Sequence, residues 1–266
     1  MQAAVGSHCL DCAKASRPDV QTRARYWNAR QHTLVTYVIM AVNLAVFGYT
    51  TVSDPGSLGG GGGITEAQFD LGLNEFFLTG GRHEWYRLVT AGFLHFGVIH
   101  LAFNMLMLYQ LGQLLERPLG RAKFALLYAA SLLGGSFGVL ILSDQQSGIH
   151  GGASGAVFGL FGAFVFVQLS RGQNPMQGGI GSTIAINLAF TFLIPGISRG
   201  AHVGGLLVGA LCGWILIGSN RLEARSRAGQ ATARTVAVAA LSLAMMAAAV
   251  WVANRVVVDG AFLNWN

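Results

Sequence analysis

The chain has 266 residues, of which 53% are hydrophobic and only 11% are charged. An ordinary soluble domain carries charge at about a quarter of its positions, so this composition excludes that class and indicates an integral membrane protein. The net charge of +6 has two common causes, an anionic partner such as nucleic acid or the charge asymmetry of a membrane protein.

Seven apolar runs are long enough, or nearly so, to cross a bilayer as helices, since about twenty residues span the hydrocarbon. They cover residues 33–52, 89–111, 124–142, 153–169, 180–195, 201–218 and 235–256. The runs are continuously apolar and do not alternate over about ten residues, which excludes a closed membrane barrel. We therefore predict an all-α, polytopic transmembrane bundle: a tail at residues 1–32, a six-helix core at residues 33–218, and a linker, seventh helix and short outer tail at residues 219–266.

Lysines and arginines set the expected orientation of the spans. If the N-terminus is cytoplasmic, most of these residues fall in inner segments, and only Arg82, Arg87, Arg199 and Arg255 fall outside. We therefore expect a cytoplasmic N-terminus and an outer C-terminus. This asymmetry and attraction to anionic lipid account for the net charge, so the expected partner is the lipid bilayer and no nucleic acid is expected.

The N-terminal tail contains a cysteine pair. His8, Cys9, Asp11 and Cys12 resemble half of a zinc site, but a tetrahedral shell needs a second pair of ligands that the tail lacks. Two exposed, reduced thiols are the simpler interpretation. We therefore expect no bound metal and no cofactor, and Cys9 and Cys12 remain the only metal candidates.

The longest connection, residues 53–88, joins the first two spans and is expected on the outer face. Its glycine run at residues 59–63 has the composition of a flexible linker. Residues 69–78 mix phenylalanines and leucines with acidic residues. They either lie as an amphipathic element at the interface or form a small apolar cluster in a solvated loop.

Polar residues occur at corresponding places in three of the spans. Ser154 opens the fourth span, His202 opens the sixth, and His95, His100 and Asn104 lie in the second. With the N-terminus inside, these three spans all run inward from the outer face, so the five side chains share a layer within a few turns of that face. Polar groups are costly in hydrocarbon, and this layer is therefore a candidate functional site.

Ser154 and His202 supply the two halves of a nucleophile and base pair, because a neutral imidazole within hydrogen-bond reach removes the serine proton. The fourth and sixth spans contain no aspartate or glutamate, which favours a dyad over a triad. Phe158 lies one turn from Ser154 on the same helix face and is placed to stack on the imidazole, although plain core packing is the alternative.

His100 and Asn104 are candidate donors to the oxyanion that forms when a serine attacks an amide. They are four residues apart and share a helix face, whereas His95 lies about 140° away from His100 and is the weaker candidate. The backbone N–H of Ser154, near a helix start, is a further candidate donor. A buried interhelical hydrogen-bond pair is the alternative interpretation of His100 and Asn104.

The motifs around these residues resemble those of rhomboid intramembrane serine proteases. Residues 152–155, Gly-Ala-Ser-Gly, resemble the family's nucleophile motif, and residues 201–205, Ala-His-Val-Gly-Gly, resemble its base motif. The three polar residues of the second span resemble its second-helix motif. The resemblance covers roughly residues 34–218 and, with the seventh helix, nearly the whole chain.

The resemblance implies a role for each candidate residue. It makes Ser154 the nucleophile, His202 the base, and His100 and Asn104 the oxyanion donors, with Gly152 in a supporting place. The implied function is an intramembrane serine endopeptidase that cleaves transmembrane protein substrates near the outer interface. It needs no cofactor.

Two further segments resemble parts of the family. Residues 84–87, Glu-Trp-Tyr-Arg, resemble a tryptophan-arginine signature of the first loop, with Arg87 aligned and either Trp85 or Tyr86 in the aromatic place. The tail resembles the second half of a small zinc module found in some actinobacterial members. A bacterial plasma membrane is therefore the expected location.

Two other classes of function remain as alternatives. Intramembrane histidines can ligate haem, but His95 and His100 are five residues apart on one helix, which is poor geometry for a single haem. A transporter would place its polar site near the midplane on interrupted helices related by repeats, and the sequence shows neither feature.

Overall fold

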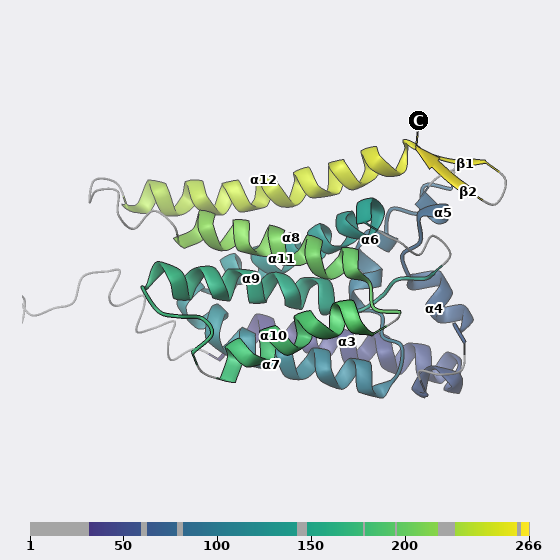
Figure 1. Cartoon of the computed structure of the whole chain (residues 1–266), viewed down its shortest axis with the longest axis horizontal. Coiled ribbons are helices and arrows are strands. Elements are labelled where there is room, and N and C mark those ends of the chain that lie inside the picture. Colours follow the sequence, from purple (N-terminus) through teal and green to yellow (C-terminus); the bar gives the residue numbers. More distant parts are fainter. Residues whose placement is uncertain are drawn as a thin grey trace, which may run out of the picture.

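The computed structural model describes residues 32–59, 63–78, 82–142, 148–177, 179–194, 196–217, 227–259 and 262–265. The seven longest helices of this part of the chain run side by side (Figure 1). They are α3 (Leu34–Ser53), α7 (Val98–Leu119), α8 (Arg121–Leu142), α9 (Ser154–Ser170), α10 (Gly179–Leu193), α11 (Arg199–Ile217) and α12 (Arg227–Ala253). All except α9 and α10 are both long and apolar enough to cross a membrane, and those two are shorter apolar helices. The predicted helical bundle is confirmed.

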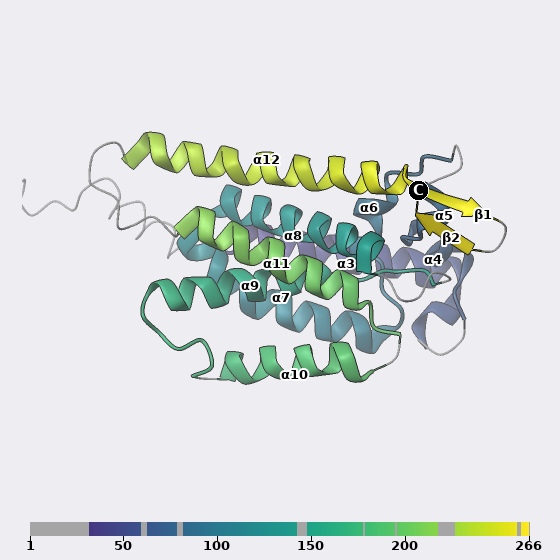
Figure 2. The same ribbon diagram turned by 45° about the horizontal axis from the view of Figure 1, so that its top comes forward.

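The remaining elements are short and most belong to the loop between α3 and α7. They are η1 (Pro55–Leu58), α4 (Glu66–Leu71), α5 (Glu75–Leu78), α6 (Arg87–Thr90) and η2 (Ala91–Phe93), followed at the other end of the chain by β1 (Val256–Asp259) and β2 (Phe262–Trp265). The two strands pair antiparallel, with Val256 opposite Trp265. Both views place this hairpin at the same end of the bundle as α4 and α5 (Figures 1 and 2).

The start of the second span differs from the prediction. The apolar run begins at residue 89, but α7 begins at Val98, because α6 and η2 precede it and the chain turns at Gly97, whose φ is 100°. Leu88 and Leu94 in this segment are completely buried. The segment is apolar because it packs inside the protein, and hydropathy alone cannot separate such a segment from a membrane helix.

Helices α8, α9 and α11 pack through glycines at nearly backbone contact. A Cβ added to Gly205 or Gly209 of α11 would overlap the backbone of Gly155 or Gly159 in α9, and one added to Gly138 of α8 would overlap the backbone of Gly200. Small residues allow helices to approach this closely in a membrane. The start of α9 and the start of α11, which carry Ser154 and His202, are therefore held side by side.

Helix α12 lies along α8 and α11 on one side of the bundle (Figures 1 and 2). Its last turns bury Ala249 and Val252 in a cluster with Leu88 of the loop and with Val139 and Leu140 of α8. On the opposite edge, α10 stands apart from α12 and packs beside α11 (Figure 2). The seventh helix, α12, therefore packs against both α8 and the loop between α3 and α7.

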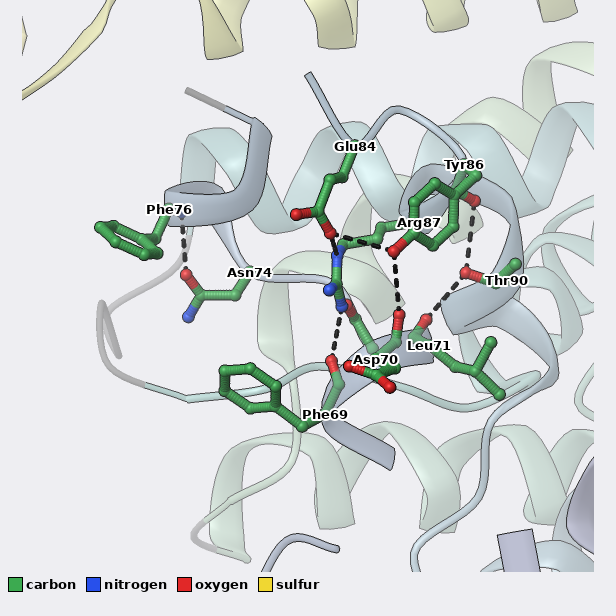
Figure 3. Close-up of polar contacts among 10 residues, drawn as sticks. Phe69, Asp70, Leu71, Asn74, Phe76, Glu84, Tyr86, Arg87 and Thr90 are labelled. Atoms are coloured by element: carbon green, nitrogen blue, oxygen red, sulfur yellow. Dashed lines mark hydrogen bonds and ion pairs between the residues drawn. The ribbon is translucent and has the colours of Figure 1, made fainter. Parts of the chain in front are cut away.

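The loop between α3 and α7 is organised around Arg87, which is only 2% exposed. Its Nε donates to Glu84 Oε2 at 2.7 Å and its Nη1 to the carbonyl oxygen of Phe69 at 2.5 Å (Figure 3). Nη1 also donates to the carbonyl oxygen of Gly72 at 2.8 Å. The guanidinium also lies 4.1 Å from the ring centre of Phe77. Arg87 therefore ties residues 66–78 to residues 84–93, and this part of the loop is a packed cluster.

The aromatic residues before Arg87 lie on different sides of it. The Tyr86 hydroxyl lies 3.0 Å from Glu84 Oε2 and 3.3 Å from the carbonyl oxygen of Asp70 (Figure 3). Trp85 packs instead against the cluster that includes the end of α12. Tyr86 is therefore the aromatic residue that joins the polar network, while Trp85 belongs to the apolar side of the loop.

Glu75, the first residue of α5, is expected to make stability depend on pH. It is 9% exposed, and burial raises the pKa of its carboxyl from 4.5 to about 7. The folded state therefore keeps a proton that the unfolded chain releases, so stability is full below about pH 4.5 and falls as the pH rises toward 7. We expect a loss of about 2 kcal/mol over this range.

The measurement is the apparent melting temperature of the detergent-solubilised protein from pH 4.5 to 8, compared with that of Glu75→Gln. The difference between the two proteins isolates Glu75 from other titrating groups. Glu75→Gln should be the more stable protein above pH 7 and should lose the advantage at low pH. A constant difference at all pH values would contradict the prediction.

Candidate active site

Ser154 and His202 lie within hydrogen-bond distance. Ser154 is the first residue of α9, His202 is in the first turn of α11, and the serine Oγ is 2.8 Å from the histidine Nε2. His202 is 7% exposed. The Phe158 ring stacks on the imidazole, with the ring centres 4.0 Å apart and the planes 13° apart. The geometry allows His202 to accept the serine proton while Phe158 fixes the plane of the ring.

The other nitrogen of His202 contacts a residue that the sequence did not single out. Thr191 Oγ1, on α10, lies 2.7 Å from His202 Nδ1. Thr191 is completely buried. A sequence signal did exist, since Thr183, Asn187 and Thr191 recur every four residues on a mostly apolar helix and so share one face.

His100 and Asn104 lie one turn apart on the same face of α7. Each side chain has an N–H that is not used in the hydrogen bonds described next. The backbone N–H of Phe96 donates to His100 Nδ1 at 3.4 Å, so the neutral ring carries its hydrogen on Nε2. Asn104 Nδ2 donates one hydrogen to the carbonyl oxygen of His100 at 2.9 Å and has a second hydrogen left. Both residues line the same cavity as Ser154 and His202.

This cavity has a volume of about 930 Å³. The four residues just described line it together with apolar side chains from α7, from α10 and from the residue after α10. These apolar residues include Val98, Ile99, Phe103, Ile186, Phe190 and Ile194. The arrangement suits a mainly apolar ligand with one polar bond presented to the serine.

Gly152 keeps the space beside the serine open. Its φ is +134°, which side chains rarely allow, and a Cβ at this position would lie 2.9 Å from His100 Nε2 and 3.5 Å from Ser154 Oγ. Its N–H donates to the carbonyl oxygen of Ala91 at 2.8 Å. The loop before α7 therefore holds Gly152 in a conformation that leaves room between the serine and a hydrogen-bond donor.

Comparison with known proteins identifies the family. Residues 82–219, just over half of the chain, match the family described as the Rhomboid domain. The chain belongs to the rhomboid family. It is 36% identical over 178 residues to Rhomboid protease GluP of Bacillus subtilis (strain 168), an alignment that covers 65% of this chain and 33% of GluP.

Relatives also occur in fungi and plants. The chain is 32% identical over 165 residues to Rhomboid-type serine protease 2 of Emericella nidulans, which covers 58% of this chain and 31% of the relative. It is 38% identical over 139 residues to RHOMBOID-like protein 4 of Arabidopsis thaliana, which covers 50% and 34%. The chain spans about a third of the length of these three relatives.

The remaining candidates of this rhomboid chain lie outside the cavity lining. His95 is completely buried, with its Nδ1 3.2 Å from the carbonyl oxygen of Phe93 and its ring 5.1 Å from that of His100. The His95 ring therefore packs against the His100 ring without lining the cavity. Arg87 also does not line the cavity, and its hydrogen bonds are made within the loop between α3 and α7. Cys9 and Cys12 lie outside the described residues, and within the described part no group of three or more potential metal ligands occurs.

Replacing Gly152 by alanine is expected to lower the reactivity of Ser154 by about 10²-fold, because the added methyl group displaces His100 by a fraction of an ångström or more. The measurement is the rate at which a fluorophosphonate, a reagent for activated serines, labels Ser154 in the detergent-solubilised protein. Gly172→Ala is the matched control, since Gly172 also has a positive φ, +70°, but its Cβ would meet no atom within 4 Å. Equal losses in the two variants would mean that backbone strain, and not the contact with His100, is responsible.

Proposed function

We propose that this rhomboid-family chain is a serine endopeptidase that hydrolyses peptide bonds of transmembrane proteins inside the membrane. The observation that carries the proposal is the 2.8 Å contact between Ser154 Oγ and His202 Nε2 in a cavity that is also lined by many apolar side chains. The names of two relatives, Rhomboid protease GluP and Rhomboid-type serine protease 2, support the same activity.

In the first half of the reaction, His202 Nε2 takes the proton of Ser154 as the serine oxygen attacks the carbonyl carbon of the scissile bond. The carbonyl oxygen becomes an oxyanion, which accepts hydrogen bonds from His100 Nε2, from Asn104 Nδ2 and from the backbone N–H of Ser154, the first residue of α9. The C–N bond then breaks. His202 returns its proton to the leaving amine, and an ester on Ser154 remains.

In the second half, water replaces the leaving amine beside His202. Nε2 removes a proton from the water as its oxygen attacks the ester carbon, and the same donors stabilise the second oxyanion. The ester bond breaks, and the proton returns to Ser154 Oγ. The new carboxyl terminus leaves the site, and the enzyme has regained its initial protonation state.

The substrate class follows from the walls of the cavity. Ile99 and Phe103 of α7 line the cavity and are also 74% and 61% exposed, so they reach both the site and the outer surface of the bundle. An extended segment unwound from a transmembrane helix fits this wall, and helix-destabilising residues in a substrate should favour cleavage. The distribution of lysines and arginines supports cleavage near the outer interface, with the N-terminus cytoplasmic and the C-terminus outside. The resemblance of the tail to that of some actinobacterial family members supports a bacterial plasma membrane.

The proposal also assigns a place to each segment of the chain. Residues 33–218 form the catalytic core. Residues 219–266 add a linker, the seventh helix and an outer tail. Residues 1–32 form a basic cytoplasmic tail in this proposal, and nearly all of them lie outside the described residues.

The test is labelling of the detergent-solubilised protein by a fluorophosphonate, which reacts with an activated serine. We expect label on Ser154 in the wild type and none in Ser154→Ala or His202→Ala. Ser170→Ala is the matched control, because Ser170 lies at the other end of α9, where its hydroxyl donates to the carbonyl oxygen of Val167. Label that persists in Ser154→Ala, or a folded wild type that takes no label, would overturn the mechanism.

A further inference from the structure

The catalytic base has a hydrogen-bond partner on the side away from the serine. Thr191 Oγ1 lies 2.7 Å from His202 Nδ1, and the same oxygen lies 2.9 Å from the carbonyl oxygen of Asn187. A triad has a carboxylate in this place. Within the described residues, no aspartate or glutamate hydrogen bonds to His202.

The number of hydrogens fixes the direction of each bond. A hydroxyl has one hydrogen, and a carbonyl oxygen can only accept, so the Thr191 hydroxyl donates to Asn187. Thr191 Oγ1 must then accept from His202, which places the imidazole hydrogen on Nδ1. His202 Nε2 is left without a hydrogen, and its lone pair faces Ser154 Oγ. This is the tautomer that a general base needs.

Resting on the function proposed above, we propose that Thr191 is a positioning residue for the base His202. Its hydroxyl holds the imidazole in the productive tautomer and accepts a stronger hydrogen bond from Nδ1 once the ring becomes positively charged. The side chain touches neither the substrate nor the serine. It takes the orienting place of the carboxylate in a triad, without a charge.

The contact also links the base to α10. The polar face of α10 continues from Thr191 to Asn187, whose Nδ2 donates to the carbonyl oxygen of Thr183 at 2.8 Å. Phe192 and Leu193 point away from this polar face and are exposed. Because a hydrogen bond is lost when its atoms separate by more than about 3.5 Å, His202 is held only while α10 lies against α11.

The experiment compares Thr191→Val, which keeps the shape but has no hydroxyl, with Thr191→Ser, which keeps the hydroxyl. We expect Thr191→Val to lower kcat for a single-span reporter by about ten- to a hundredfold, with KM within about twofold of the wild type. The rate of fluorophosphonate labelling should fall by a similar factor. Thr191→Ser should restore both rates to within about threefold.

Ser182→Ala is the matched control. It removes a hydroxyl that bonds only within α10, to the carbonyl oxygen of Gly179, and should leave both rates unchanged. If Thr191→Val does not fold, Thr191→Ala replaces it, and we expect the same decrease in kcat and in the labelling rate. Folding is scored by size exclusion and apparent melting temperature.

Either of two results would overturn the inference. Equal losses in Thr191→Val and Thr191→Ser would show that the site needs threonine for packing, and wild-type rates in Thr191→Val would show that the hydroxyl is not used. Failure of the proposed function looks different, because Ser154 in the wild type would then take no label, or Ser154→Ala would still be labelled.

Discussion

Replacing Ser154 by alanine is expected to lower the rate of reporter cleavage by at least about 10⁴-fold, and His202→Ala is expected to have a similar effect. The double variant should be no slower than the slower of the two single variants. The reason is that a nucleophile and its base act as one unit, so the loss of either removes the contribution of both. The 2.8 Å contact between their reacting atoms is the geometric basis of this coupling.

The measurement is the initial rate of cleavage with saturating reporter in reconstituted vesicles. Ser154→Ala should keep its apparent melting temperature within a few degrees, because the stack of Phe158 on His202 and the glycine contacts of α9 with α11 remain. Losses that multiply in the double variant would contradict the prediction, since the two side chains would then act independently.

The number and type of helices could be predicted because each buried or lipid-facing run is apolar over nearly its whole length. That Ser154, His202, His100 and Asn104 lie at a common level of the bundle could also be inferred, since the direction of successive membrane spans alternates. The start of α7 could not be predicted. Leu88, Ala91 and Leu94 are apolar because they are buried inside the folded loop, and the sequence carries no sign that separates them from the helix after Gly97.

The contacts inside the loop between α3 and α7 could not be predicted from the sequence either. The Nη1 of Arg87 binds the carbonyl oxygens of Phe69 and Gly72, and any residue type can supply a backbone carbonyl. Only the folded chain shows which carbonyls converge on the guanidinium. The resemblance of residues 84–87 to a family signature pointed to Arg87 but gave no partner for it.

Thr191 was missed for a related physical reason. A threonine within an apolar helix usually donates to the carbonyl four residues earlier, as Thr191 does with Asn187. That bond uses the only hydrogen of the hydroxyl but leaves its lone pairs free. Whether another helix brings a donor to them depends on tertiary packing, and here α11 brings His202.

The oxyanion donors are expected to give the second largest effect on catalysis. His100→Ala and Asn104→Ala should each lower kcat by about 10²- to 10³-fold with little change in KM, because these hydrogen bonds strengthen only as charge develops on the substrate oxygen. The measurement is the full dependence of the cleavage rate on the concentration of the reporter. His95→Leu is the control, since His95 lies behind His100 and outside the cavity lining, and it should affect stability more than kcat.

The substitution Asn104→Asp tests whether Asn104 donates to the oxyanion or only belongs to a structural hydrogen-bond pair. Aspartate has nearly the same shape but replaces the amide donor by a carboxylate, which accepts and repels the oxyanion. If Asn104 donates in the transition state, Asn104→Asp should be at least as slow as Asn104→Ala. Both substitutions also remove the hydrogen bond from Nδ2 to the carbonyl oxygen of His100, so a purely structural role would show as a loss of cleavage that follows the loss of apparent melting temperature. Faster cleavage by Asn104→Asp would remove Asn104 from the oxyanion site and leave His100 and the backbone N–H of Ser154 as its donors.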